Sequence, residues 1–306
     1  MRLGVLVIAS LALQLAAHPV AAAAPIHPHV MVIVEENREE SDVIGSPDAP
    51  YITQLAHTYG FATNAFAQAH PSLPNYLELI SGSTFGVSDD GTTYRFDGPT
   101  LADQLSAAGY SWRAYMEGMP SPCYRDDASG RYAKKHNPFM YFNSITGNPS
   151  SCANVVPFTS FTHDIAAPSP PDFVWVTPDV CNDGHDCSTS TADAWLKRTL
   201  AEVVQSSWFH DNGVVIVTWD EGSGNGGCCN GAAGGHVATI VVAQPAQQAA
   251  LHAAVDHAGT LRSIEELYGV SLLRDAACAC SGSLAALLPP TLRPLVLSWA
   301  TVPRFR

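Results

Sequence analysis

The sequence predicts an α/β fold in which a doubly wound, mostly parallel sheet carries helices on both faces. Apolar runs typical of buried strands alternate along the chain with segments that have one apolar face, as helices do. This alternation favours βαβ units over separate all-α or all-β domains. Polar clusters follow the apolar runs, which is where open α/β sheets bind their ligands.

The predicted strands come from the apolar runs. Residues 29–34 form a continuous apolar stretch, HVMVIV, suited to a parallel strand buried on both faces. Two other strands end sharply, because Pro178 follows one and Asp220 follows the other. Strands are expected over residues 29–34, 110–116, 173–177, 213–219 and 237–242.

The predicted helices come from turn and capping residues. One begins near Pro50, since proline suits the first helical turn, and is expected to end at Gly60. Another begins near Pro74 and runs to Gly82. A third covers residues 101–108.

Residues 1–24 have the layout of a cleavable export signal. Arg2 precedes an uncharged apolar run and a small-residue region that ends before Pro25. A membrane anchor is the alternative, but the apolar run is short for a bilayer span and is broken by His18 and Pro19. We therefore expect a secreted or periplasmic protein with a single domain over residues 25–306.

The chain is acidic, with a net charge of -13 that becomes -14 once the signal and its Arg2 are removed. Such a charge disfavours general nucleic-acid binding. The apolar segment over residues 284–300 is interrupted by prolines and an arginine, so no transmembrane segment is expected there. An anionic substrate would need a local cluster of positive charge.

The chain has 8 cysteines, and an even number in an exported protein favours disulfides. The sequence does not fix the pairing. Zinc binding by the adjacent Cys228 and Cys229 is an alternative that an oxidising compartment disfavours. Local bridges are expected between Cys181 and Cys187 and between Cys123 and Cys152.

Two acidic clusters follow two of the predicted strands, Glu35-Glu36-Asn37 and Asp220-Glu221. Oxygen ligands gathered from several strand ends suit a divalent cation such as Mg²⁺, Ca²⁺ or Mn²⁺. Alternation along the strand favours Glu36, Asn37, Asp220 and Glu221 as the ligands. For either pair taken alone, solvation of a loop is the ordinary alternative.

The turn before the second predicted helix contains Ser72, in the run His70-Pro-Ser-Leu-Pro-Asn-Tyr76. A serine at a helix N-terminus meets free N–H groups and the positive end of the helix dipole, which suit a phosphorylated intermediate. The alternative is that Ser72 is an ordinary N-cap.

Positive charge and histidines are concentrated in two loops. The chain has three lysines, and Lys134 and Lys135 adjoin His136, an arrangement that suits a phosphate clamp or a solvated basic loop. His185 lies between two cysteines, and an imidazole there can protonate a leaving alkoxide near neutral pH. The glycine-rich loop 222–235 lacks a Walker pattern, and His236 after it is expected to be structural.

Together these stretches resemble the bacterial phosphoesterase family that includes secreted acid phosphatases and non-specific phospholipases C and is related to the alkaline phosphatase superfamily. The small secreted acid phosphatases, some of which act on phosphatidylinositol phosphates, are the most similar group. The segments that carry the resemblance are residues 29–37, 70–77, 134–139, 182–186 and 218–221.

The resemblance implies an alkaline-phosphatase-like fold and a site with assigned roles. Ser72 would be the nucleophile, with His185 or His136 as the proton donor. Lys135 and Asn75 would bind substrate, although Lys135 stands where some relatives have histidine. The long Gly-Cys insertion after Glu221 is another departure. The implied metal ligands are Glu36, Asn37, Asp220 and Glu221.

The expected function is that of a secreted, metal-dependent acid phosphatase that hydrolyses phosphomonoesters through a phosphoserine. Its substrates would be small phosphorylated molecules or phospholipid headgroups. A phospholipase C-type phosphodiesterase is the first alternative, because the same residues serve diester hydrolysis. A non-enzymatic, secreted calcium-binding protein is the second.

Overall fold

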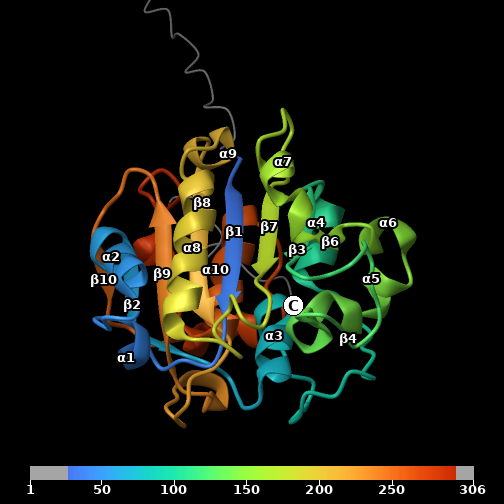
Figure 1. The fold of residues 1–306 in the computed structure, drawn as a ribbon, viewed down its shortest axis with the longest axis horizontal. Helices are drawn as coiled ribbons and strands as arrows, with labels where there is room; N and C mark the ends of the chain where they lie inside the picture. The colour runs from blue at the N-terminus through green and yellow to red at the C-terminus, as the bar shows by residue number, and fades with distance from the viewer. Residues whose placement is uncertain (1–26, 294–306) are drawn as a thin grey trace, which may run out of the picture.

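The fold is given by a computed structural model that describes residues 27–293, so the predicted signal over residues 1–24 lies outside the described residues. Its centre is a 9-stranded sheet with the order β10-β2-β9-β8-β1-β7-β3-β6, and β11 pairs with β2 (Figure 1). The strands of this sheet are β1 (His29–Glu35), β2 (Gly60–Phe66), β3 (Trp112–Met116), β6 (Val155–Pro157), β7 (Phe173–Thr177), β8 (Gly213–Trp219), β9 (His236–Ala243), β10 (Ala249–Leu251) and β11 (Val255–Asp256); a hairpin is formed by β4 (Ala128–Ser129) and β5 (Tyr132–Ala133).

Strand β1 lies at the centre and pairs in parallel with β8 on one side and β7 on the other. Every residue of β1 is buried, as the continuous apolar run predicts. The three strands therefore end at the same edge of the sheet. Strand β9 is antiparallel to both β8 and β2, so the sheet is mixed, although most of its pairs are parallel.

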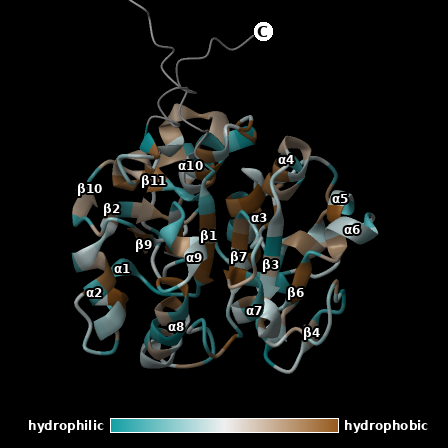
Figure 2. Ribbon diagram, turned by 90° about the horizontal axis from the view of Figure 1, so that it is seen from above, coloured by the Kyte–Doolittle hydropathy of each residue, from teal (hydrophilic) through white to brown (hydrophobic). Residues whose placement is uncertain are grey.

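Helices cover both faces of the sheet, which confirms the predicted fold class (Figures 1 and 2). Helices α2 and α8 pack together on one face, and α10 packs against α3 and α4 on the other. No helix within residues 27–293 is both long and apolar enough to cross a membrane. The helices are α1 (Glu40–Val43), α2 (Pro50–Thr58), α3 (Ser72–Ser81), α4 (Leu101–Ala108), α5 (Asn143–Thr146), α6 (Pro149–Cys152), α7 (Phe161–Ile165), α8 (Thr189–Val203), α9 (Ser207–His210) and α10 (His257–Tyr268).

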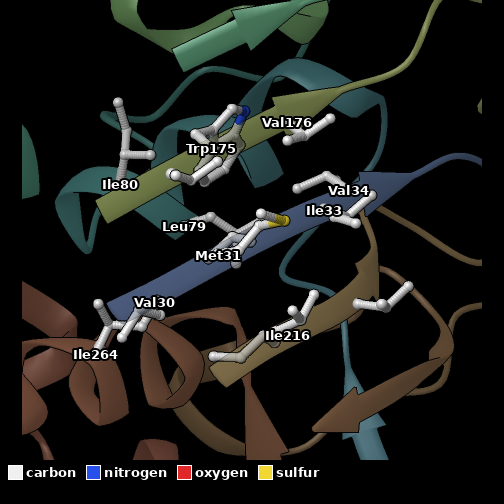
Figure 3. Packing of buried hydrophobic residues seen from close by; sticks show 14 of the residues in the cluster. Val30, Met31, Ile33, Val34, Leu79, Ile80, Trp175, Val176, Ile216 and Ile264 are labelled. Atoms are coloured by element: carbon white, nitrogen blue, oxygen red, sulfur yellow. The ribbon is translucent and has the colours of Figure 1, made fainter. Parts of the chain in front are cut away.

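The core lies between the sheet and these helices. Figure 3 shows side chains of β1 packed beside Trp175 of β7 and Leu79 of α3, all nearly inaccessible to solvent. Burial of each large aliphatic side chain stabilises the fold by about 1.5–3 kcal/mol. Strands β1 and β7 are thus fixed in place up to the edge where their polar residues begin.

Several element boundaries differ from the predictions: β3 begins at Trp112 rather than at residue 110, and β1 and β9 extend one residue past the predicted ends. Gly60 opens β2 rather than ending a helix, because α2 already ends at Thr58. Helix α3 begins at Ser72, two residues before the predicted start. Its end at Gly82 is as predicted, and a side chain would not fit there: φ is +68°, and a Cβ atom would lie 2.5 Å from the Leu273 carbonyl oxygen.

Candidate active site

The polar residues predicted to form a site do come together at the carboxyl edge of β8, β1 and β7. Backbone hydrogen bonds connect the ends of β8 and β1 and the loop after β7: the Asp220 amide donates to the Glu35 carbonyl at 2.9 Å, and the Glu36 amide donates to the Asp183 carbonyl at 3.0 Å. The backbone of the acidic residues is therefore fixed by the sheet itself. Their side chains lie where parallel α/β sheets bind ligands.

Ser72 is the first residue of α3 and is 1% exposed. The N-cap of the helix is Pro71, and the Ser72 hydroxyl makes no capping bond, so the N-cap alternative is wrong. The hydroxyl instead donates to carboxylates at two strand ends, to Glu36 Oε2 at 3.2 Å and to Glu221 Oε1 at 3.3 Å. A serine oxygen flanked by two carboxylates, at a helix N-terminus, is well placed to lose its proton and to act as a nucleophile.

Asn75, predicted to bind substrate, is fully buried and has other partners. Its Oδ1 accepts hydrogen bonds from the Gln68 and Ala69 amides, both at 2.9 Å. Its Nδ2 donates to the carbonyls of Ala69 at 2.7 Å and Pro71 at 3.2 Å. These bonds occupy both ends of the amide, so Asn75 shapes the turn that presents Ser72.

The carboxylates of Glu36 and Glu221 contact Ser72, and Asn37 connects Glu36 with Asp220. The Asn37 amide donates to Asp220 Oδ1 at 3.0 Å, and Asn37 Nδ2 donates to Glu36 Oε2 at 3.3 Å. Asn37 adopts a left-handed backbone with φ of +53°, a conformation that asparagine tolerates better than most residues. All four predicted metal ligands are thus in one cluster.

Burial shifts the acids of this cluster toward their protonated forms. Desolvation and the charge of Asp220 raise the pKa of Glu36 well above its ordinary value. Desolvation and the charge of Glu221 raise the pKa of Asp220 to about 7. Asp220 Oδ2 has no hydrogen-bond partner although it is buried. Hard oxygen ligands that lack a counter-charge fit a divalent cation, which would bind the spare oxygen and favour ionised carboxylates.

His136 is buried between two acids in the same cluster. Its Nε2 lies 3.2 Å from Glu36 Oε1, its Nδ1 lies 3.3 Å from Asp183 Oδ2, and its ring stacks on Tyr76. The Tyr76 hydroxyl donates to Glu36 Oε1 at 2.6 Å. Burial lowers the pKa of His136 well below its ordinary value and raises the pKa of Asp183 to about 8.

A second combination of ligand atoms overlaps the predicted one. Glu36, His136 and His185 each offer one atom, and these atoms lie within 4.8 Å of one another. Glu36 belongs to both combinations. A cation held by either combination would contact Glu36.

His185 and Lys135 lie at the rim of the cluster, and both are partly exposed. Lys135 Nζ lies 3.2 Å from His185 Nε2, and His185 Nδ1 lies 2.7 Å from Asp186 Oδ1. An ammonium group has no lone pair, so Nε2 is the acceptor in this contact and Nδ1 carries the proton that Asp186 accepts. The imidazole thus presents a basic nitrogen toward the ammonium.

A disulfide and a neighbouring arginine hold the loop that carries His185. The disulfide Cys181–Cys187 closes it, as predicted. Arg38 donates to the carbonyls of Gly184 at 2.8 Å and Cys187 at 3.2 Å. The loop is therefore attached to β1 through the residue that follows Asn37.

The other cysteines agree with the predictions in part. Among the described residues, Cys123–Cys152 and Cys278–Cys280 are also disulfides, while Cys228 and Cys229 are free thiols. No third histidine, cysteine or acid within residues 27–293 joins these two thiols as a metal ligand, so the zinc alternative gains no support. His236 bonds to the Thr63 carbonyl at 3.0 Å, a structural contact.

Several residues of the site were not predicted. His70 Nδ1 contacts Glu221 Oε2, and its Nε2 lies 2.8 Å from the Gly224 carbonyl. Burial lowers the pKa of His70, but the bonds to Glu221 and the Gly224 carbonyl and the charges of Glu221 and Asp220 together outweigh it and raise the pKa. His257 Nε2 lies 2.6 Å from the Asp220 carbonyl. His70 and Tyr76 lie in the run that contains Ser72, so their proximity was a usable signal; His257 had none.

Comparisons with known proteins agree with this geometry. The model of the Phosphoesterase family matches residues 42–271. A phosphatidylinositol-3-phosphatase of Mycobacterium tuberculosis is 33% identical over 254 residues, 82% of this chain and 80% of that protein. A phosphate-repressible acid phosphatase of Penicillium chrysogenum is 35% identical over 177 residues, 56% of this chain, and the match spans only 43% of the fungal protein.

Solved structures share the fold at low sequence identity. A protein of the alkaline phosphatase superfamily from Vibrio parahaemolyticus aligns with a TM-score of 0.58 and 13% identity, over 83% of this chain and 70% of that one. A phosphonate monoester hydrolase of Agrobacterium radiobacter aligns with a TM-score of 0.53 and 13% identity, over 84% and 77%. The chain therefore belongs to the Phosphoesterase family and is a phosphoric ester hydrolase.

Proposed function

We propose that the protein is a metal-dependent phosphomonoesterase that works through a phosphoserine on Ser72. The observation that carries the proposal is the position of the Ser72 hydroxyl, which is buried at a helix N-terminus and bonded to both Glu36 and Glu221. A structural calcium site has no need for a serine in this position. The relatives named as acid phosphatases and phosphatidylinositol-3-phosphatase support the same chemistry.

The metal would be held by Glu36, Asn37, Asp220 and Glu221. When bound, a divalent cation lowers the pKa of a nearby hydroxyl and neutralises phosphate oxygens. Its identity is proposed as Mg²⁺, Ca²⁺ or Mn²⁺ on the basis of the oxygen ligands.

The protein's own groups account for the remaining steps. Ser72 gives its proton to one of the flanking carboxylates, its oxygen bonds to phosphorus and the bond from phosphorus to the leaving alcohol breaks, while Lys135 supports the phosphate oxygens. We assign the proton donor to His185 rather than His136, because His185 is partly exposed whereas His136 is buried between Glu36 and Asp183. Water then hydrolyses the phosphoserine, with the same imidazole as base.

This assignment predicts an acidic range of activity. A histidine must be protonated before it can donate a proton to the leaving group. Turnover of a poor leaving group should therefore fall as the pH rises, whereas a nitrophenolate, which leaves without a proton, should be less affected.

The polar lining of a groove beside the site favours a polar leaving group. An open groove of about 750 Å³ includes Asn37, and its lining contains Arg38 and the hydroxyl groups of Ser41, Thr189 and Ser223. Hydroxylated alcohols, including the inositol ring of a phosphoinositide, suit such a lining better than an acyl chain does. We therefore retain phosphoinositides among the proposed substrates.

Turnover of a chromogenic phosphomonoester and of the matching diester, with and without chelator, tests the proposal. Ser72→Ala should lower kcat for the monoester by about a thousandfold or more, because it removes the nucleophile. Ser81→Ala is the matched control: it lies in the same helix, and its hydroxyl bonds only to backbone carbonyls.

Each alternative has its own outcome in these assays. Turnover of the diester alone would assign the protein to the phospholipase C type. Loss of thermal stability on chelation, with no turnover of either ester, would favour the calcium-binding alternative.

We also propose export, with the mature chain beginning near Pro25. The disulfides Cys123–Cys152 and Cys181–Cys187 support an oxidising compartment. The mass of the protein recovered from the periplasm or medium tests this proposal. A full-length mass would contradict cleavage of the signal.

A further inference from the structure

Asp90 lies in the loop between α3 and α4, where no motif predicts a functional residue. Its carboxylate connects two parts of the proposed site. Oδ1 accepts a hydrogen bond from the Leu73 amide at 3.0 Å, and Oδ2 accepts one from Lys135 Nζ at 2.9 Å. Asp90 therefore contacts both the helix that begins at Ser72 and the predicted phosphate-binding lysine.

The first contact is at the start of α3. The N-terminal amides of a helix have no partner within the helix, and Pro71 supplies no side-chain cap. Asp90 provides an acceptor for the amide of the residue directly after Ser72. An acid at this end of the helix is also favoured by the helix dipole. The contact helps to fix the first turn, which carries the nucleophile.

The second contact restrains a flexible side chain. Lys135 is attracted by Glu36 and Asp220 as well as by Asp90. The 2.9 Å ion pair between Lys135 Nζ and Asp90 Oδ2 fixes the end of the side chain. Without Asp90, the attraction of Glu36 and Asp220 would draw the ammonium toward the carboxylates that are needed for the metal. With Asp90 present, it is held beside His185 Nε2.

We propose that Asp90 is a positioning residue of the phosphate pocket, which holds the Lys135 ammonium beside His185 and the Leu73 amide beside Ser72. Asp90, Lys135, His185 and Asp186 form a continuous row of contacts from the helix to the leaving-group side. A phosphoryl group bound at Ser72 then meets donors that are already oriented, which is how enzymes stabilise developing charge. The inference rests on the proposed function.

A double-mutant cycle with Asp90→Asn and Lys135→Met tests the inference. Asparagine keeps an oxygen for the Leu73 amide and loses only the charge that faces Lys135. Asp90→Asn should lower kcat/KM for a phosphomonoester by about tenfold, the value of one charge-assisted hydrogen bond. In the Lys135→Met background the same change should have no further effect, because Asp90 acts through Lys135.

Asp89→Asn is the matched control. Asp89 is the adjacent acid and bonds only within its own loop, to the Gly91 amide and the Tyr94 hydroxyl, both at 2.9 Å. It should keep wild-type kcat/KM. If Asp90→Asn does not fold, as judged by circular dichroism, Asp90→Ser replaces it in the cycle. Wild-type kcat/KM in the Asp90 variant, or an equal loss in both backgrounds, would overturn the inference.

A second readout separates this inference from the proposed function. If the wild type hydrolyses no phosphomonoester, the proposed function fails, and the cycle is repeated with the Kd for inorganic phosphate from calorimetry. If Asp90→Asn changes the Kd, and this change disappears in the Lys135→Met background, the result would still support the proposal that Asp90 positions Lys135. An equal change in both backgrounds, or no change or no binding in any variant, would contradict it.

Discussion

Asp164, on helix α7 beside β3, is paired with a cation, whereas Glu36 and Asp220, at the carboxyl ends of β1 and β8, are not. Asp164 accepts hydrogen bonds from Arg113 at 2.7 Å and from the Tyr115 hydroxyl at 3.0 Å. Among the described residues, no lysine or arginine forms an ion pair with Glu36 or Asp220. Asp164 and the two site acids all lie beside the central sheet, yet their surroundings differ.

The pKa values of the two groups move in opposite directions. Burial alone would raise the pKa of Asp164, but hydrogen bonds from Arg113, His163 and Tyr115 outweigh it and lower the pKa. The pKa of Asp220 rises to about 7, since burial and Glu221 act together. Asp164 is thus neutralised by Arg113, whereas Glu36 and Asp220 have no lysine or arginine partner among the described residues, and a bound cation can supply that charge. Buried acids whose pKa values are strongly shifted in this way are typical of functional sites.

The largest expected effect is a difference in kcat between Asp220→Asn and Asp164→Asn. Asp220→Asn should lower kcat by at least about a hundredfold, since loss of an outer partner of a metal alone lowers activity by about 10- to 100-fold. Asp164→Asn should keep kcat near wild type and lower the free energy of unfolding by about 1 kcal/mol. Kinetics and urea unfolding of both variants check this. Equal losses of activity in the two variants would contradict the distinction between the site acids and Asp164.

The next effect is a dependence of stability on metal and pH. Without metal, the raised pKa values of Asp220, about 7, and Asp183, about 8, mean that the folded state binds more protons than the unfolded state from about pH 4 upward. Stability contributed by these acids is present below that range and is lost as the pH rises toward 8. Urea midpoints of the chelated protein should therefore fall across this interval.

Added metal should reverse that trend. A cation at ~100 times its Kd stabilises the folded state by about 2.7 kcal/mol, and its binding improves as the carboxylates ionise. Asp220→Asn should abolish most of this gain, and Asp164→Asn should keep it. Asp164 changes the pH dependence only at acidic pH. Its pKa is lowered in the folded protein, so the stability that it contributes is lost as the pH falls through that lowered pKa. An identical pH profile with and without metal would contradict a cation at the carboxyl edge.

The smallest effect concerns the loop of His185. Replacing Cys181 and Cys187 by serine opens a short loop, which should lower the free energy of unfolding by about 2 kcal/mol. Activity should fall less than in Asp220→Asn, because Arg38 still holds the Gly184 carbonyl. The double variant Cys123→Ser/Cys152→Ser, in which a disulfide outside the cluster is lost, is the control. A greater loss of kcat in this control than in the Cys181→Ser/Cys187→Ser variant would contradict a role of the His185 loop in catalysis.

Much of the fold could be predicted because its central strands are continuous apolar runs. Strand β2 could not be predicted. Its sequence, GFATNAF, contains small and polar residues, and three of its residues are only partly buried while a fourth is exposed. The antiparallel direction of β9 is equally hidden, because strand direction is set by chain connections that local sequence does not show. The predicted end of the first helix was wrong because Gly60 serves a strand instead.

The candidate site was predictable where its residues follow strands or share one short run. Glu36, Asp220 and Ser72 fall in this class. Asp90 does not, because it reaches Leu73 and Lys135 across 17 and 45 residues. The direction of the Asn75 amide was also hidden, since a residue in a first helical turn can face either a ligand or the preceding loop. Long-range pairing and side-chain direction are what the sequence leaves open.

Trapping the covalent intermediate tests the central claim most directly. The metal-loaded protein is mixed with a phosphomonoester at acidic pH and quenched within a turnover, and the phosphorylated peptide is identified by mass spectrometry. One phosphoryl group on Ser72, absent from Ser72→Ala, is the predicted result. Full turnover with no phosphorylated serine, or with the phosphoryl group on another residue, would contradict the account.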